Sequence, residues 1–409
     1  MSSSHPPAPQ GPLPLRVLHI SGRSDHGGGP EHLLQAISAD LCGIVHHIAC
    51  PESGLYWNRF CHRLGRDHLC SIPHRRLSLA ALLDLRTFAR AQKIQVIHSH
   101  GMSGGIYGRL LGLLTGLPVL HTFHGVPVTP GLKHRFYQIA ELALAQITNC
   151  GIAVSAGEAD LVHKRWKSYR GRLAVVPNGI DIGNEPPPWS PWPSSESEEV
   201  RIVSFSRRNH QKHPELLIEI ARCLTLLGAR FRMDAYGEGL DHPELAAEAL
   251  RRGVGDHLYF HPPTDDPGGS LMGRHVYLST SRWEGMPLAV LEAWRSGLVV
   301  VATDVIGNRD LVADGQTGCL FPSGQGRRAA RMIHALVADT AKAEQIRTNS
   351  ARRASLGHGR DLMALRLEWL YHRMCRGMRQ VEPTSANHWP DAPAEADDSR
   401  RLPLRTVNG

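Results

Sequence analysis

The chain has 409 residues, of which 42% are hydrophobic and 21% charged, as is typical of globular proteins. This length favours two domains over one, and no run of about 18 apolar residues is present to span a membrane. The N-terminus has neither the basic nor the apolar region of a secretory signal, so we expect a cytoplasmic protein. The eight cysteines show no C-x-x-C spacing and are expected to be buried free thiols.

The net charge of +8 is concentrated in the first half of the chain. Residues 1–185 hold 18 Lys and Arg against 11 Asp and Glu, whereas the remainder holds 28 against 27. An acidic partner is therefore expected to meet the first half. A basic run interleaved with aromatic residues is not found, so we expect no nucleic-acid partner.

Short apolar strands alternate with helical segments throughout, which predicts parallel α/β layering. In the first half we expect strands at 15–20, 94–100, 118–125, 151–155 and 172–181, with one helix opened by the glycines at 27–30 and another near 103–115. In the second half we expect strands at 200–206, 231–239, 258–262, 275–280 and 298–305, with helices near 214–227, 243–252 and 287–296 and further helices to about 380.

The pattern divides the chain into two doubly wound, Rossmann-like domains that face each other across a cleft. The expected boundaries are a disordered N-terminus (1–14), a first domain (15–183), a proline-rich linker (184–199), a second domain (200–380) whose last helices could pack back on the first, and a disordered tail (381–409).

Parallel sheets bind ligands at the carboxyl ends of their strands, and three groups of residues there are candidates for a site. Gly28 and Gly29 follow the first strand and open a helix, whose free N–H groups suit a phosphate; a simple tight turn explains them equally well. Arg207 and Lys212 follow the strand at 200–206 and could converge on a diphosphate without a metal. Ordinary solvated cations on the protein surface would give the same sequence pattern.

The third group is the segment EGMPLAVLE, in which Glu284 and Glu292 are eight residues apart. Pro287 suits the first turn of a helix, and such a helix offers unpaired N–H groups near Met286, Leu288 and Ala289. The two carboxylates could accept hydrogen bonds from sugar and ribose hydroxyls. The alternative is two solvent-facing acids on a helix.

Taken in order, these segments resemble the retaining GT-B glycosyltransferases of family 4, the glycosyl transferases group 1 class, over most of 15–375. The resemblance is carried by GGGPEHLL at 27–34, VIHSHG at 96–101, HTFHG at 121–125, AVS at 153–155, VPNGID at 176–181, SRRNHQK at 206–212, YGEG at 236–239, S-x-x-E-G-M-P-L-A-V-L-E at 281–292 and VVATDVIGNRDLVADGQTGCLF at 300–321.

The resemblance implies that a sugar moves from a nucleotide diphosphate sugar, bound mainly by the second domain, to an acceptor held by the first. Carried over by position, Glu284 would bind the donor sugar, Glu292 the ribose, and Arg207 and Lys212 the diphosphate. Gly28 and Gly29 would approach the diphosphate from the opposite domain, and His124 would lie near the reacting sugar. The implied donor site also includes Gly237, Gly285, Met286, Pro287 and Leu288. For His124 a purely structural role is the alternative, because the chain has 25 histidines.

The sequence contains no D-x-D motif, the usual carboxylate pair for Mg²⁺ on a diphosphate, and Arg with Lys can replace the metal. We therefore expect a metal-independent enzyme with no cofactor besides its nucleotide-sugar co-substrate. Two departures from the family, Pro262 where Gly is common and His275 where Asp is frequent, leave the nucleotide base open.

The acceptor is expected to be a saccharide or a lipid-linked molecule of cell-envelope or exopolysaccharide assembly. In segment 56–66, Trp57, Phe60, Cys61 and Leu64 follow helical spacing beside several arginines, which suits either a helix lying on an anionic membrane surface or a core-facing helix. Two other functions stay open: an epimerase acting on a nucleotide sugar with the same architecture, and a noncatalytic nucleotide-sugar-binding subunit.

Overall fold

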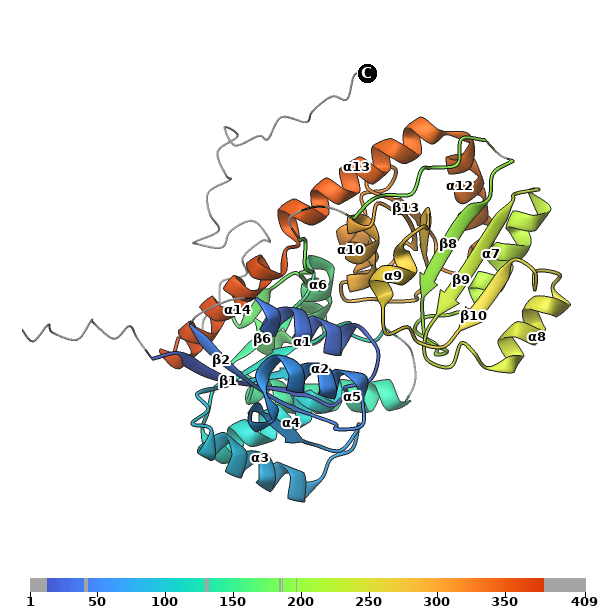
Figure 1. Cartoon of the computed structure of the whole chain (residues 1–409). Coiled ribbons are helices and arrows are strands. Elements are labelled where there is room, and N and C mark those ends of the chain that lie inside the picture. Colours follow the sequence, from blue (N-terminus) through green and yellow to red (C-terminus); the bar gives the residue numbers. More distant parts are fainter. Residues whose placement is uncertain are drawn as a thin grey trace, which may run out of the picture.

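The computed structural model describes residues 13–39, 43–128, 132–183, 185, 187–195 and 197–378, with the backbone alone for 132–136. The expected disordered ends, 1–14 and 381–409, lie outside these residues except for 13 and 14. Two parallel β-sheets with flanking helices form the molecule (Figure 1). The predicted α/β, GT-B-like fold class is confirmed.

The first sheet has seven parallel strands in the order β3-β2-β1-β4-β5-β6-β7. Its strands are β1 (Leu15–Ser21), β2 (Ile44–Cys50), β3 (Leu69–Ser71), β4 (Val96–His100), β5 (Val119–Thr122), β6 (Cys150–Ala153) and β7 (Leu173–Val175). The helices between them are α1 (Gly28–Ser38), α2 (Leu55–Leu64), α3 (Leu79–Ala91), α4 (Gly101–Thr115), α5 (Leu132–Gln146) and α6 (Ala156–Arg165), with short 3₁₀ turns η1 (Arg66–His68) and η2 (Lys167–Tyr169).

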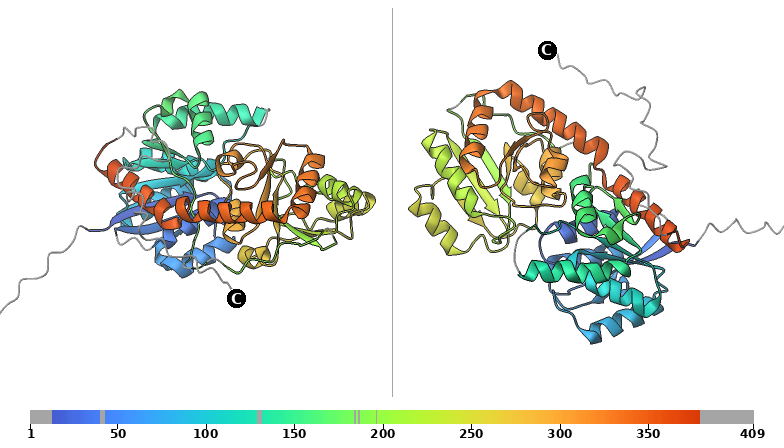
Figure 2. Two further views of the ribbon diagram at one scale, coloured as in Figure 1. Left: turned by 90° about the horizontal axis from the view of Figure 1, so that it is seen from above. Right: turned by 180° about the vertical axis from the view of Figure 1, so that it is seen from behind.

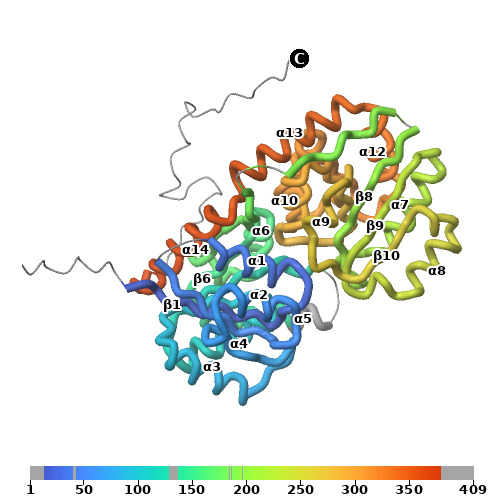
Figure 3. The backbone as a smooth tube through the Cα atoms, viewed as in Figure 1, coloured from blue at the N-terminus to red at the C-terminus, as the bar shows by residue number. Residues whose placement is uncertain are grey.

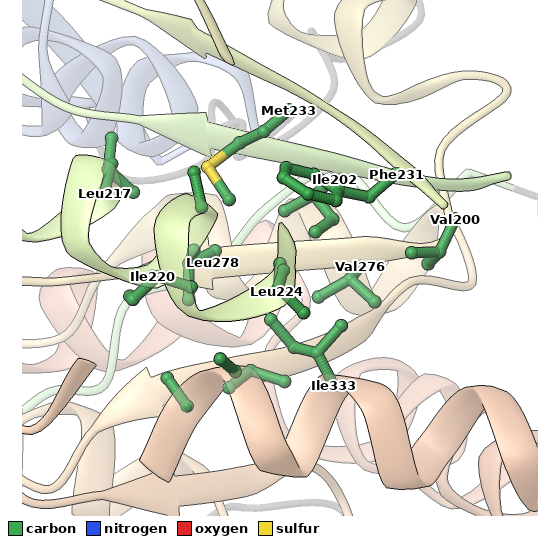
Figure 4. Packing of buried hydrophobic residues seen from close by; sticks show 14 of the residues in the cluster. Val200, Ile202, Leu217, Ile220, Leu224, Phe231, Met233, Val276, Leu278 and Ile333 are labelled. Carbon is green, nitrogen blue, oxygen red and sulfur yellow. The ribbon is translucent and has the colours of Figure 1, made fainter. Parts of the chain in front are cut away.

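The second sheet has six parallel strands in the order β10-β9-β8-β11-β12-β13. Its strands are β8 (Val200–Phe205), β9 (Phe231–Tyr236), β10 (Leu258–His261), β11 (Val276–Ser279), β12 (Val299–Thr303) and β13 (Cys319–Phe321). Its helices are α7 (Glu215–Leu226), α8 (Pro243–Arg251), α9 (Pro267–Leu271), α10 (Leu288–Arg295), α11 (Asn308–Leu311), α12 (Gly326–Ala338) and α13 (Thr340–Gly357). Figure 4 shows α7 and α12 packing their apolar faces against this sheet, with Leu224 and Ile333 close together.

The last helix, α14 (Arg360–Cys375), returns to the first domain (Figures 2 and 3). Its residues Met363, Leu367 and Leu370 share one buried cluster with strands β1 and β4. The hydroxyl of Tyr371 also lies 2.6 Å from Nδ1 of His98 in β4. The first domain is therefore completed by the last helix of the chain.

The chain crosses between the domains twice, and the two crossings pair with each other. The N–H of Ile180 donates to His358 O at 2.9 Å, and the N–H of Arg360 donates to Ile180 O at 2.8 Å. In the described part of the proline-rich segment there is no helix or strand, yet Trp192 is buried and its Nε1 donates to Leu336 O at 3.1 Å. The proline-rich segment thus packs against the second domain instead of lying free between the two domains.

Helix α2 turns its apolar stripe inward. Trp57 and Phe60 are buried, and Cys61 and Leu64 pack against the same cluster. The core-facing interpretation of 56–66 therefore holds, and the stripe is not presented to a membrane. No helix in the described residues has the length and apolarity needed to cross a membrane.

The described cysteines are all free thiols, as expected, but their burial varies. Cys50 and Cys150 are buried, whereas Cys375 is exposed. The expectation of buried thiols is therefore right for only part of the set.

Candidate active site

The two domains meet where the carboxyl ends of their strands face each other. Asn178 Nδ2 donates to Met286 O at 2.7 Å, and the N–H of Gly157 donates to Asp310 Oδ1 at 3.0 Å. His26, next to the glycine-rich turn, lies 2.7 Å from Asp265 Oδ1 of the second domain. The predicted site residues lie at the domain junction that these contacts form.

The glycine-rich turn receives an arginine from the second domain. A β-carbon on Gly27, whose φ is +141°, would lie 2.9 Å from Arg207 Nη2, whereas one on Gly28 or Gly29 would have no neighbour within 4 Å. Gly28 and Gly29 therefore open α1 toward free space, beside a guanidinium. Burial, reinforced by the charge of Arg23, lowers the pKa of Arg207 to about 10, so Arg207 still carries its positive charge at neutral pH.

Lys212 and Glu284 form an ion pair beyond the carboxyl ends of β8 and β11 in the second sheet. The Lys212 ammonium lies 2.5 Å from Glu284 Oε1, which also accepts a hydrogen bond from Ser281 Oγ at 2.6 Å. Glu284 is 9% exposed, and its charge acts on Arg207. The structure thus brings Arg207, Lys212 and Glu284 together at one place.

Glu292 lies eight residues after Glu284, on α10. Burial, reinforced by the charge of Glu31 on α1, raises its pKa from 4.5 to about 8. A carboxyl group with that pKa is mostly protonated at pH 7 and has an O–H to donate. Pro287 is the residue before α10, because the helix begins at Leu288, rather than lying in its first turn as expected.

His124 follows β5 with a left-handed backbone, φ +59°. Its Nε2 lies 3.1 Å from Nδ1 of His100, and its ring packs edge-on against His32, with ring centroids 4.5 Å apart. Burial, reinforced by the charges of His32 and His98, lowers the pKa of His124 well below its usual value, so the ring is neutral at physiological pH.

Two glycines, Gly125 and Gly285, lie where the backbones of the two domains meet. A β-carbon on Gly285 would lie 2.7 Å from the backbone nitrogen of Gly125 and 3.0 Å from the carbonyl carbon of His124. The backbones of the His124 loop and the Glu284 loop are therefore in direct contact, and a side chain at either glycine would separate them.

Gly237 and Met286 have structural partners of their own. A β-carbon on Gly237, whose φ is +153°, would lie only 1.7 Å from Ser206 O, so its backbone position excludes other residues. The carbonyl of Met286 accepts from Asn178 across the domain boundary. The structure thus gives both residues a role in shaping the site.

Sequence reasoning missed Glu158 on α6. Its Oε1 accepts from the N–H of Gly125 at 2.5 Å and its Oε2 from the N–H of Val154 at 2.8 Å. This buried carboxyl holds the loop that carries His124, and burial raises its pKa to about 7. Its sequence signal is the spacing Ser155-x-x-Glu158, which marks a helix start but does not reveal the contact with Gly125.

Two sets of buried or half-buried histidines have ring nitrogens within 4.8 Å of one another: His19, His98 and His100, and His32, His100 and His124. Most of these nitrogens already have partners. His98 uses both of its ring nitrogens, on Tyr371 and Thr122, and His100 uses both of its own, on His19 and His124. Because both ring nitrogens of His19, His98 and His100 are paired, we interpret these three as hydrogen-bonded neutral imidazoles rather than as metal ligands.

Two Rossmann-like domains with cations, carboxylates and two helix starts at their junction have the architecture of the GT-B glycosyltransferases. Two family models match the chain: "Glycosyltransferase Family 4" over residues 32–184 and "Glycosyl transferases group 1" over residues 191–353. Together they span most of the chain, which belongs to the group 1 glycosyltransferases.

Individual relatives agree with this assignment. The chain is 28% identical over 388 residues to an alpha-maltose-1-phosphate synthase of Mycobacterium tuberculosis, covering 85% of this chain and 93% of the relative. It is 24% identical over 261 residues to the UDP-Gal:alpha-D-GlcNAc-diphosphoundecaprenol alpha-1,3-galactosyltransferase of Escherichia coli, covering 59% and 66%. In fold it is similar to Anabaena HepE in complex with UDP-glucose, with a TM-score of 0.75, 18% identity and coverage of 88% and 99%.

Proposed function

We propose that this chain is a retaining glycosyltransferase that uses a nucleoside diphosphate sugar and needs no metal ion. The observation that carries the proposal is the meeting of Arg207, Lys212 and Glu284 opposite the glycine-rich turn. Cations and a carboxylate placed side by side suit a ligand that carries phosphates next to sugar hydroxyls.

Sugar transfer creates positive charge at the anomeric carbon and negative charge on the departing phosphate. Arg207 and Lys212, with the N–H groups at the start of α1 and α10, would stabilise the departing charge. Glu284 would accept hydrogen bonds from the donor sugar, and Glu292 would bind the ribose. His124 would lie beside the reacting sugar.

For retention of configuration, the departing phosphate would take the acceptor's proton on the face from which it leaves. The new glycosidic bond then forms on that same face, and the pair of electrons of the broken bond stays on the phosphate. Because two protein cations already face this charge, a divalent ion is not required.

The acceptor is proposed to be a saccharide or a lipid-linked molecule of envelope or exopolysaccharide assembly, held by the more basic first half of the chain. The Escherichia coli relative, named for a diphosphoundecaprenol acceptor, supports this choice. The protein would then act in the cytoplasm, at the inner face of the membrane. With the apolar stripe of α2 buried, any attachment there would depend on charge.

The test is the release of nucleoside diphosphate from a panel of nucleotide sugars, with and without a lipid-linked acceptor, in EDTA and in Mg²⁺. We expect transfer in EDTA, with the anomeric configuration of the donor retained in the product. Strict Mg²⁺ dependence or an inverted product would contradict the proposal. An epimerised nucleotide sugar would indicate an isomerase, and binding without turnover would indicate a noncatalytic subunit.

The first prediction concerns the ion pair itself. Glu284→Ala and Lys212→Ala should each lower kcat about a hundredfold, the loss expected for one transition-state interaction worth about 3 kcal/mol. The control is Glu244→Gln, which breaks the exposed pair between Glu244 and Arg208 and should leave the rate unchanged. Unchanged transfer in both alanine variants would show that the site is assigned wrongly.

A further inference from the structure

Four histidines form a continuous hydrogen-bonded series across neighbouring strands of the first sheet. His46 Nδ1 lies 3.0 Å from His19 Nε2, His19 Nδ1 lies 3.2 Å from His100 Nε2, and His100 Nδ1 lies 3.1 Å from His124 Nε2. They come from β2, β1, β4 and the end of β5, which are adjacent in the sheet. We call these four residues the imidazole series.

Every member of the imidazole series is neutral at pH 7. Burial is the largest cause, and it lowers the pKa of His46 to about 4 and those of His19, His100 and His124 well below the usual value. A neutral imidazole has one N–H donor and one acceptor nitrogen. Each ring can therefore donate in one direction only.

This restriction couples the four tautomers. If one ring carries its proton on Nδ1, its neighbour must accept at Nε2 and carry its own proton on Nδ1, and so on to the end of the series. Only two states make all three hydrogen bonds: every proton on Nδ1, or every proton on Nε2. The end at His124 is thus tied to the end at His46, three strands away.

The surroundings of the imidazole series favour the first state. Arg63 of α2 acts on His46 with its positive charge, and a cation favours a lone pair over an N–H at the outer nitrogen, Nε2. Other titratable groups near the series are His47, His98 and His121 on the sheet, His32 on α1 and Tyr371 on α14. At the other end, among the described residues, His124 Nδ1 makes no hydrogen bond.

We propose that His46, His19 and His100 are positioning residues that fix His124 as the Nδ1–H tautomer, so that it donates a hydrogen bond to the bound donor. This inference rests on the proposed function only for the identity of the ligand. An N–H in this position can donate to a sugar hydroxyl oxygen or to a phosphate oxygen. The opposite tautomer would present a lone pair, which repels a phosphate oxygen and can only accept a hydrogen bond from a hydroxyl.

The test is to substitute His46 at one end of the imidazole series and to observe the tautomer of His124 at the other end. With histidine labelled with ¹⁵N, NMR distinguishes the two tautomers of each ring without any substrate, and single substitutions assign the signals. In the wild-type protein we expect all four rings as Nδ1–H. His46→Asp places an acceptor-only oxygen where Nδ1 was, so His124 should change to Nε2–H. His46→Asn can still donate and should keep the original tautomer.

His47→Gln is the matched control, because His47 is the next residue in β2 and bonds to Gln92 outside the series. It should leave the tautomer of His124 and the rate unchanged. With whichever nucleotide sugar the wild-type protein turns over, His46→Asp should lower kcat about tenfold relative to His46→Asn, a typical effect of removing a residue that orients a catalytic group.

Mixed tautomers in the folded wild-type protein would overturn the proposal. So would an unchanged His124 in a folded His46→Asp variant, or a transition metal found in equal amount with the purified protein, since a ligating nitrogen cannot carry the proton. The NMR result does not depend on turnover. If no donor is turned over, the proposed function fails while the imidazole series can still be judged.

Discussion

At the scale of single residues, the site depends on carboxyl groups whose surroundings differ. Glu284 is paired with Lys212 and Ser281, whereas Glu292 faces another carboxylate, Glu31, across the domain boundary. The identities and spacing of Glu284 and Glu292 were evident from the sequence. The ion pair with Lys212 and the approach of Glu31 were not, because these two residues lie far from Glu284 and Glu292 in the chain.

The raised pKa of Glu292 predicts how stability changes with pH. The folded protein keeps this proton up to about pH 8, whereas the unfolded chain loses it near pH 4.5. The folded state thus binds more protons in this window, and its stability should fall as pH rises from about 4.5 to 8. Glu292→Gln should remove that part of the slope.

The measurement is the free energy of unfolding in urea for wild type and Glu292→Gln across this pH range. As pH rises, the free energy of unfolding of Glu292→Gln should increase relative to that of the wild type. A difference that stays constant with pH would show that Glu292 titrates normally in the folded protein.

At the scale of helices and strands, apolar runs indicated most of the sheet correctly. Strand β12 (VVVAT) is almost continuously apolar, and β1 (LRVLHIS) and β8 (VRIVSF) are mostly apolar, as buried parallel strands usually are. Strand β2 was missed because His46 and His47 interrupt its apolar run. The partner of each histidine depends on strand order, which local sequence does not encode.

Helix α14 supplies a prediction at this scale. Leu367 is buried against the first sheet, so Leu367→Ala should lower the free energy of unfolding by about 2 to 5 kcal/mol through the cavity it leaves. Leu365, on the same helix, is 48% exposed, and Leu365→Ala should have little effect. Equal losses in the two variants would mean that α14 does not pack as described.

At the scale of the whole molecule, the alignment of the two domains depends on backbone contact. The contact between Gly125 and Gly285 leaves no room for a β-carbon, and the pair between His26 and Asp265 lies at the rim of the same junction. The sequence indicated two domains and a cleft. It could not indicate how closely they meet, because that distance depends on residues far apart in the chain.

Gly285→Ala should therefore lower kcat at least about tenfold by pushing apart the loops that carry His124 and Glu284. Gly357→Ala, where a β-carbon meets nothing within 4 Å, should have wild-type activity and equal or slightly higher stability. Thermal unfolding of both variants separates misalignment from misfolding. Full activity in Gly285→Ala would show that this contact does not set the geometry of the site.

The return of α14 to the first domain has a consequence for a broken chain. A protease cut within 184–199 would leave one fragment holding the first sheet and another holding the helix that completes its core. The fragments should remain associated without a covalent bond. Expressed separately, the two fragments should bind each other and reassemble. The protein could then serve as a split enzyme, whose activity shows that its two fragments have met.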